Sequence, residues 1–516
     1  EQVTRGALGQ AVAEVIFSDF DRYAGHLETI AFIGPAFAVS LLGGFTADKR
    51  GTSVRWEDAL DLCEALLSDP DVRQSLDNVA DENWRGARQM MVSLLEAGVE
   101  KPKAEVGGEK HNIRVPPELL PRVRDLLLTL LDDPDPGPES DRPAENFFGH
   151  NDPATVALNH VRPRAMLALI QYAAHRALAE QEETGDDRAA HTVVSRLEPE
   201  VREALTRKLD QREEPSSAVH CVYGWNLYRL RWLDQEWLEA HLDAIFPEGD
   251  DPETAWLFVA AWDAYVAFNR NTFVRPFFEK LRPKYERAID NLARDLVTRT
   301  HLEPSRGLAS HLLWEYLKAD YHLQSTEGEN SLLLRFFKKA PPKERGGAAW
   351  LLWRICQDNP KYLNDIWPRV RHFWEWRVDE AARANHPNDF DTEMEWYARL
   401  PLVAFELETI RSIWTLLEGT LPHVVRFEHH GLGWDALEEY LVKEVQRDPL
   451  RAIQFYHLMH KRLSRSVWFY SKGESRTIIE TAAAHESSRQ EALALIDTLA
   501  RSGNHQYRDI YQQYAG

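Results

Sequence analysis

The apolar positions of the chain recur with the period of an α-helix. Four segments place apolar residues at intervals of three and four, which lines one face of a helix. Alternating apolar and polar runs are scarce, and none is joined by a good Asn-Gly or Asp-Gly hairpin turn. The pattern therefore predicts an all-α fold. The four stripes are Trp56, Ala59, Leu60, Cys63 and Leu67; Val123, Leu126, Leu127 and Leu130; Met166, Leu169, Ile170, Ala173 and Ala177; and Ala492, Leu495, Ile496 and Leu499.

Prolines preceded by acidic or amide residues mark the expected helix starts. Asp or Asn at the N-cap accepts a free backbone N–H, and proline at the next position gives up no hydrogen bond. Glu is a poor N-cap, so the two Glu-Pro pairs are the weaker signals. The pairs are Asp69-Pro70, Asp152-Pro153, Glu198-Pro199, Asp251-Pro252, Glu303-Pro304, Asn359-Pro360 and Asp448-Pro449.

The spacing of five of these prolines is close to that of a helical repeat. They stand at 153, 199, 252, 304 and 360, with separations of 46, 53, 52 and 56 residues. HEAT and armadillo repeats, which are helical hairpins, are roughly 40–47 residues long. The spacing is irregular and the intervening sequences differ. We expect an irregular, solenoid-like array of this kind, and the alternative is an irregular α domain with a common helix cap.

Proline-rich and acidic stretches suggest where the chain divides. Residues 132–145 carry four prolines among acids, which predicts a non-helical linker over 132–150. It separates an N-terminal helical region, 1–131, from a central array, 151–340. A softer break follows in Ala340–Gly347, so a C-terminal array covers 341–516. A second acidic loop is expected at Glu180–Asp187.

Charge and cysteine content narrow the classes of function. The 516 residues hold 82 acidic and 61 basic side chains, a net charge of −21, which argues against a general nucleic-acid coat. Three widely spaced cysteines, Cys63, Cys221 and Cys356, form no disulfide framework and suggest a reducing, cytoplasmic location. No apolar run is long enough for a bilayer, so we expect no membrane span. The chain opens without Met, which is consistent with a fragment of a longer protein.

The common catalytic motifs are missing from the sequence. It has no phosphate-binding loop, no dinucleotide fingerprint, no zinc-protease motif and no nucleophile elbow. We therefore expect no enzyme activity and no cofactor in this stretch. His457 and His460 have a spacing that could share zinc, with His429 and His430 upstream, but further ligands are not evident. We expect no bound zinc.

Tryptophan and arginine concentrate between residues 350 and 414, and such residues supply most binding hot spots. Trp374 and Trp376 lie on different faces of a helix, so at least one indole leaves the local apolar stripe. The alternative is that these indoles pack in the core. The candidate partner-binding residues are Trp367, Arg371, Trp374, Trp376 and Arg377.

A basic cluster interrupts the acidic background near the C-terminus. Lys461, Arg462 and Arg465 precede an aromatic run at 468–470, and this combination can hold single-stranded nucleic acid. The alternative is a helix C-terminus with its usual cations. A nucleic-acid-binding module and a structural oligomerisation scaffold are therefore the alternative functions.

One segment carries a family resemblance. In residues 151–165, Asn159, Arg162 and Ala165 match an N-x-x-R-G-x-A helix pair, with Pro163 where glycine is usual. This resembles the helical C-terminal regions of bacterial antiphage proteins, namely Avs-type STAND NTPases and related sirtuin-domain defence proteins. Similar patterns occur in residues 261–270 with 281–285, and in 437–514.

The resemblance implies a sensor role and carries over no catalytic residue. In such proteins the effector and the NTPase precede the helical region. The expected function is recognition of a phage-derived protein, relayed to an effector or NTPase outside this chain. A homo-oligomer or a larger complex is the expected assembly.

Overall fold

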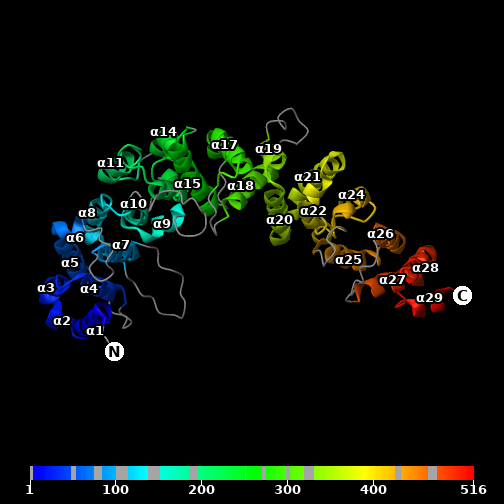
Figure 1. Ribbon diagram of the computed structural model, residues 1–516, viewed down its shortest axis with the longest axis horizontal. Helices are drawn as coiled ribbons and strands as arrows, with labels where there is room; N and C mark the ends of the chain where they lie inside the picture. Colours follow the sequence, from blue (N-terminus) through cyan, green and yellow to red (C-terminus); the bar gives the residue numbers. More distant parts are fainter. Residues whose placement is uncertain are drawn as a thin grey trace. The chain divides into compact units, whose positions relative to one another are not determined.

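In the residues that the computed structural model describes, all regular secondary structure is helical (Figure 1). No strand occurs in this part of the chain, so the all-α prediction is confirmed. No helix found there is long and apolar enough to cross a membrane. The described residues are 4–47, 54–74, 84–99, 114–137, 152–184, 195–249, 251–269, 275–297, 303–318, 331–424, 432–462 and 473–515.

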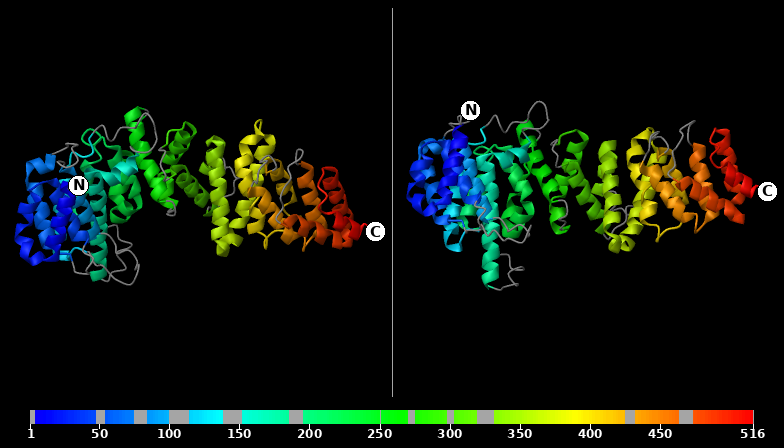
Figure 2. Two further views of the ribbon diagram at one scale, coloured as in Figure 1. Left: turned by 60° about the horizontal axis from the view of Figure 1, so that its bottom comes forward. Right: turned by 90° about the horizontal axis from the view of Figure 1, so that it is seen from below.

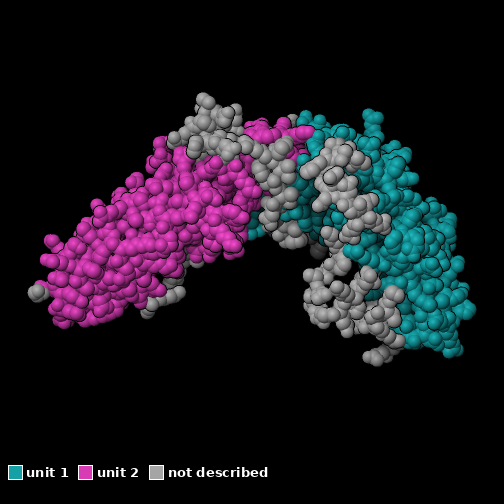
Figure 3. All heavy atoms as spheres, turned by 180° about the vertical axis from the view of Figure 1, so that it is seen from behind, with its two compact units in different colours: residues 1–272, 296–307 teal, residues 273–295, 308–516 magenta. Residues whose placement is uncertain are grey.

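The chain forms two compact units, shown in two colours in Figure 3. Unit 1 comprises residues 1–272 and 296–307, and unit 2 comprises 273–295 and 308–516. The predicted 132–150 segment thus falls within unit 1, and the predicted division at 340 and 341 falls within unit 2.

Unit 1 contains the first fifteen α-helices. They are α1 (Arg5–Ser18), α2 (Phe20–Tyr23), α3 (Leu27–Ala31), α4 (Pro35–Ala47), α5 (Trp56–Ser68), α6 (Pro70–Gln74), α7 (Arg85–Val99), α8 (Leu120–Leu130), α9 (Pro153–Asn159), α10 (Val161–Thr184), α11 (Pro199–Arg207), α12 (Ser217–Trp225), α13 (Leu227–Leu233), α14 (Gln235–Ile245) and α15 (Pro252–Phe268), with short 3₁₀ turns at Ala24–His26 and Pro117–Leu119.

Unit 2 contains the later helices, and α18 (Pro304–Lys318) begins in unit 1 and continues into unit 2. The others are α16 (Arg275–Lys280), α17 (Arg282–Ala293), α19 (Leu332–Lys339), α20 (Pro342–Asp358), α21 (Leu363–Arg383), α22 (Asp391–Tyr397), α23 (Leu400–Val403), α24 (Trp414–Val424), α25 (Leu432–Glu444), α26 (Pro449–Arg462), α27 (Glu474–Ala484), α28 (Glu486–Arg501) and α29 (Arg508–Tyr514), with 3₁₀ turns at Pro360–Tyr362 and Pro387–Phe390.

The four predicted apolar stripes lie in α5, α8, α10 and α28. Every residue named for them is buried, so one face of each helix is removed from water. Burial of such side chains is the main favourable term in folding. The periodicity therefore identified the core face of these helices correctly.

The seven predicted helix starts are also confirmed, six as α-helices and Pro360 as a 3₁₀ turn. Asp152 Oδ2 accepts the N–H of Thr155 at 3.1 Å, and Asp251 Oδ1 accepts that of Thr254 at 2.9 Å. Glu198 caps nothing; its carboxylate pairs with Arg124 instead. The difference follows side-chain length, because the short Asp side chain reaches back to its own helix.

The predicted acidic loop at Glu180–Asp187 is wrong over its first five residues. Helix α10 continues to Thr184, and the loop prediction for 185–187 lies outside the described residues. Glu and Gln are good helix formers, so a run of them extends a helix as readily as it ends one. Arg176 supports this extension by pairing with Glu180 one turn later, at 2.9 Å.

Helices pack mainly on helices that are close to them in the sequence. In unit 1, α1 packs on α4, α4 on α7, α7 on α10 and α12 on α15. In unit 2, α20 packs on α22, α22 on α24 and α25, and α27 on α28. Figure 2 gives two further views of the helices, in which segments of similar colour, and so close in the sequence, lie next to each other.

Glycine is required where α12 crosses α15 and where α1 crosses α4. A Cβ built on Gly224 of α12 would overlap the carbonyl oxygen of Ala261 in α15, and one on Gly9 of α1 would lie 2.8 Å from the carbonyl oxygen of Ala36. Beside the first crossing, the rings of Trp225 and Phe268 stack with centroids 3.6 Å apart. The close approach of the two backbones brings these side chains together.

We expect Gly224→Ala to destabilise unit 1 by about 1–3 kcal/mol or more, because its methyl group would meet backbone that cannot move aside. The measurement is a thermal melt of the full chain. Gly86→Ala is the matched control, since a Cβ there would lie 3.5 Å from Val39, an ordinary contact. Equal melting temperatures for the two variants would contradict the close crossing.

Candidate functional site

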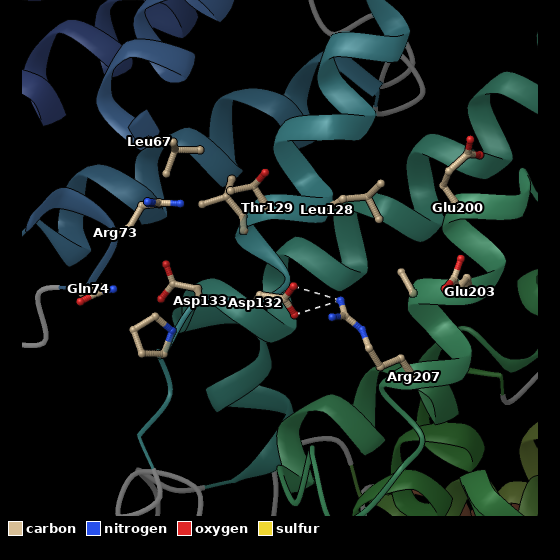
Figure 4. A pocket seen from close by; sticks show the side chains of 13 residues that line it. Leu67, Arg73, Gln74, Leu128, Thr129, Asp132, Asp133, Glu200, Glu203 and Arg207 are labelled. Atoms are coloured by element: carbon tan, nitrogen blue, oxygen red, sulfur yellow. Dashed lines mark hydrogen bonds and ion pairs between the residues drawn. The ribbon is translucent and has the colours of Figure 1, made fainter. Parts of the chain in front are cut away.

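A groove in unit 1 opens between α6, the end of α8 and α11 (Figure 4). We call it the unit 1 groove. Its volume is about 670 Å³, within the range of roughly 300–1,000 Å³ typical of ligand sites. The lining combines leucine side chains with charges of both signs. The lining residues are Leu67, Arg73, Gln74, Leu128, Thr129, Leu130, Asp132, Asp133, Pro134, Glu200, Glu203, Ala204 and Arg207.

Ion pairs at the end of α8 fix one side of this groove. Arg207 Nη2 donates to both carboxylate oxygens of Asp132 at 3.0 Å, as Figure 4 shows. Lys208 Nζ lies 3.2 Å from Asp132 and 3.0 Å from Glu214. Two cations therefore hold Asp132: Arg207, the last residue of α11, and Lys208, which follows it.

Asp133 is buried and lies against an equally buried cation. Arg88 of α7 donates through Nε to Asp133 Oδ2 at 2.6 Å, and it also donates to the carbonyl oxygen of Val72 in α6. Burial raises the pKa of Asp133, and the Arg88 charge opposes that shift. The pair therefore ties α7 to the segment after α8.

The next carboxylate, Asp135, is held by three groups. It lies 2.8 Å from His160 Nδ1 and 3.1 Å from Arg85 Nε, and it accepts the N–H of Val161 at 2.8 Å. Burial alone would raise its pKa, but these partners hold the pKa below its usual value. Residues 132–137 of the predicted linker are thus packed in unit 1, and 138–150 lie outside the described residues.

We expect Arg88→Met to destabilise unit 1 by about 3–5 kcal/mol, because Asp133 would remain buried without its cation. Urea unfolding of the full chain measures the loss. The double variant Arg88→Met with Asp133→Asn removes both charges while keeping the acceptor for the Asp135 N–H, so it should recover part of the stability. Equal losses in the single and double variants would show that charge is not the cause.

The predicted partner-binding residues lie on α21, and three of the five are buried. Trp374 is 0% exposed, and its indole donates to Thr420 Oγ1 at 2.9 Å. Trp367 donates to Glu408 Oε1 at 2.8 Å. Arg377 makes two hydrogen bonds with Glu393, at 2.7 and 2.9 Å. These three side chains contribute to packing within unit 2.

The other two residues keep contact with solvent. Arg371 is 35% exposed and pairs with Glu408 at 2.9 Å and Glu375 at 3.2 Å. Trp376 is half-buried, with Arg377 4.7 Å from its ring centre. A partner could reach these two side chains of α21 directly, so the partner-binding assignment stays a prediction that depends on them.

We expect Trp374→Ala to destabilise unit 2 by about 3–5 kcal/mol, since it leaves a cavity and an unpaired Thr420. Trp376→Ala should cost clearly less, because part of that ring is already in water. Melting curves of the two variants, recorded side by side, measure the difference. A lower melting temperature for Trp376→Ala than for Trp374→Ala would contradict the assignment.

A half-exposed group of tryptophans lies on α20 and α22, and we call it the indole–arginine cluster: Trp350, Trp353, Trp396 and Arg399. Trp396 has its ring centre 5.4 Å from that of Trp353 and 6.4 Å from that of Trp350. The Arg399 guanidinium lies 4.7 Å from the Trp353 ring and 4.9 Å from the Trp396 ring. The sequence showed these tryptophans but not that two helices bring them together.

Glu395 lies next to this cluster and has an unusual environment. Its Oε2 accepts the N–H of Gly433 at the start of α25 at 2.6 Å, while Oε1 is buried and has no hydrogen-bond partner among the described residues. Burial raises the pKa of Glu395 to about 7, and the Gly433 hydrogen bond and the Arg399 charge both act against the shift. Near neutral pH this carboxyl group is therefore protonated in part of the molecules and charged in the rest.

Of the histidines singled out in the sequence, His457 has hydrogen-bond partners within the protein. His457 Nδ1 lies 2.5 Å from Glu491, and its Nε2 lies 3.2 Å from Thr498. Burial lowers the pKa of His460 to about 4. In the described part of the chain, no three His, Cys, Asp or Glu residues are placed to share a metal ion. His429 and His430 lie outside the described residues.

The predicted basic patch is described only in part. Lys461 and Arg462 form the exposed last turn of α26, where cations favour the helix C-terminus. Arg462 lies 3.7 Å from Glu418. Arg465 lies outside the described residues.

Comparison with known proteins gives no relative from which a function could be transferred. No family model, no curated protein and no solved structure matches the chain. The candidate sites therefore depend on their own geometry.

Proposed function

We propose that the chain is a helical scaffold that recognises a protein partner. In this proposal the helix pairs of each unit form an irregular, solenoid-like array of the HEAT or armadillo kind. Such arrays present extended surfaces to partners. The packing of each helix on near neighbours in the sequence supports this reading.

The indole–arginine cluster is the observation that carries the proposal. Trp and Arg are enriched among the few residues that dominate binding energy, especially where they are partly desolvated and rigid. Three indoles of α20 and α22 meet the guanidinium of Arg399, which follows α22, and each keeps part of its surface in water. Edge-to-face and tilted contacts between the rings hold them in place before a partner arrives, which lowers the entropy cost of binding.

The family resemblance supplies the proposed context. The scaffold would be the sensor region of a bacterial antiphage defence protein in the cytoplasm, and its partner would be a phage-derived protein. Binding would favour one of two states of an effector or NTPase outside this chain, within a homo-oligomer or a larger complex. Such coupling requires that the partner bind one state more tightly than the other.

The test is direct binding of individually purified phage proteins to the full chain, measured by biolayer interferometry. We expect at least one phage protein to bind. Trp353→Ala and Trp396→Ala should each weaken that binding about 30-fold or more, since hot-spot truncations cost about 2 kcal/mol or more.

Trp414→Ala is the matched control. Trp414 is also half-buried in unit 2 and also lies under an arginine, Arg451 at 5.5 Å, but it is outside the cluster. It should leave binding within about twofold. Binding that is indifferent to Trp353 and Trp396, or a complete phage set without a binder, would refute the proposal.

A further inference from the structure

The unit 1 groove carries one cation and one anion that have no ion pair among the described residues. Arg73 comes from α6, and Glu203 comes from α11. Both side chains are exposed. In Figure 4 they lie on opposite sides of the groove, with the end of α8 between them.

The other strong charges of the groove are already paired. Asp132 is held by Arg207 and Lys208, and Asp133 is held by the buried Arg88. Glu200 lies 4.0 Å from Arg124. These ion pairs hold the groove wall in place, and their charged groups are already neutralised by protein partners. Arg73 and Glu203 are therefore the two charges that a ligand can satisfy.

Between these charges the lining is partly apolar, with Thr129, Asp132 and Asp133 beside the leucines. Leu67, Leu130 and Ala204 are buried, and Leu128 is half-buried. Leu128 and Pro134 keep apolar surface in water, and a ligand that covers them removes it while its ends meet Arg73 and Glu203. Apolar contact with a few placed polar groups is the usual composition of a binding site.

The openness of the rim selects an extended chain over a small molecule. Six of the lining side chains are exposed charged or amide groups, namely Arg73, Gln74, Asp132, Glu200, Glu203 and Arg207. Small-molecule sites bury most of the surface of their ligand. A groove with an exposed polar rim would leave much of a small ligand in water. The groove also has four carboxylates against two guanidinium groups, which disfavours the phosphates of nucleic acids.

We infer that the unit 1 groove binds an extended peptide segment of a partner protein. An acidic side chain of the peptide meets Arg73, apolar side chains cover the leucines, and a basic side chain meets Glu203. This site is separate from the indole–arginine cluster of unit 2, and its test does not depend on the proposed function.

The experiment uses the full chain and three fluorescent synthetic peptides with the same apolar centre. One peptide has an acidic and a basic end, one has two acidic ends, and one has two basic ends. Fluorescence anisotropy gives the three affinities. The native chain should bind the peptide with one acidic and one basic end best. The Glu203→Lys variant should prefer the peptide with two acidic ends, and the Arg73→Glu variant should prefer the peptide with two basic ends. Each matched charge should change the affinity about two- to fivefold, as for ion pairs in contact with water.

Two variants control for total charge. Glu236→Lys and Arg212→Glu make the same charge changes at exposed positions that do not line the groove. They should keep the native preference for the mixed peptide, and so should Trp353→Ala in unit 2. The inference is overturned if no peptide binds, or if the order of the three peptides is the same in the native chain and in both groove variants.

Discussion

The burial of one apolar face per helix, against helices close by in the sequence, is the constraint on which the rest of this structure depends. Because α4 packs on α1 and α7, and α22 on α20 and α24, few long connections are needed within a unit. Glycine at the α12–α15 crossing shows how near two backbones come when that burial is tight. Side chains on the remaining faces are then available for recognition.

Buried ion pairs add specificity to this apolar packing. Arg88 with Asp133 joins α7 to the end of α8, and Arg377 with Glu393 joins α21 to α22. The free energy needed to remove two charges from water offsets most of the free energy of their attraction. Such pairs therefore contribute little net stability. Their effect is to exclude other arrangements, because a helix that slipped by one turn would leave a buried charge unpaired. In unit 1 the same pair shapes one side of the groove.

Local signals in the sequence were sufficient for the helices but not for the sites. The stripe of α5 and the cap at Asp251 depend on residues within a few positions of each other, so both could be predicted. The burial of Trp374 depends on Thr420, which is 46 residues away. The indole–arginine cluster needs α20 and α22 side by side, and the groove needs α6, α8 and α11 together. The sequence did not predict that residues 132–137 pack in unit 1, because the prolines of this segment indicate only that it is not helical.

The position of Glu395 has a consequence for the thermodynamics of association. Its carboxyl group has a pKa of about 7 and interacts with Arg399 of the indole–arginine cluster. A partner that placed a cation there would lower this pKa and release a proton to solvent, whereas an anion would cause proton uptake. In the proposed complex, association at this surface would therefore be linked to proton uptake or release. Its heat would vary with the ionisation enthalpy of the buffer, and the sign of the proton flux would report the charge that the partner brings.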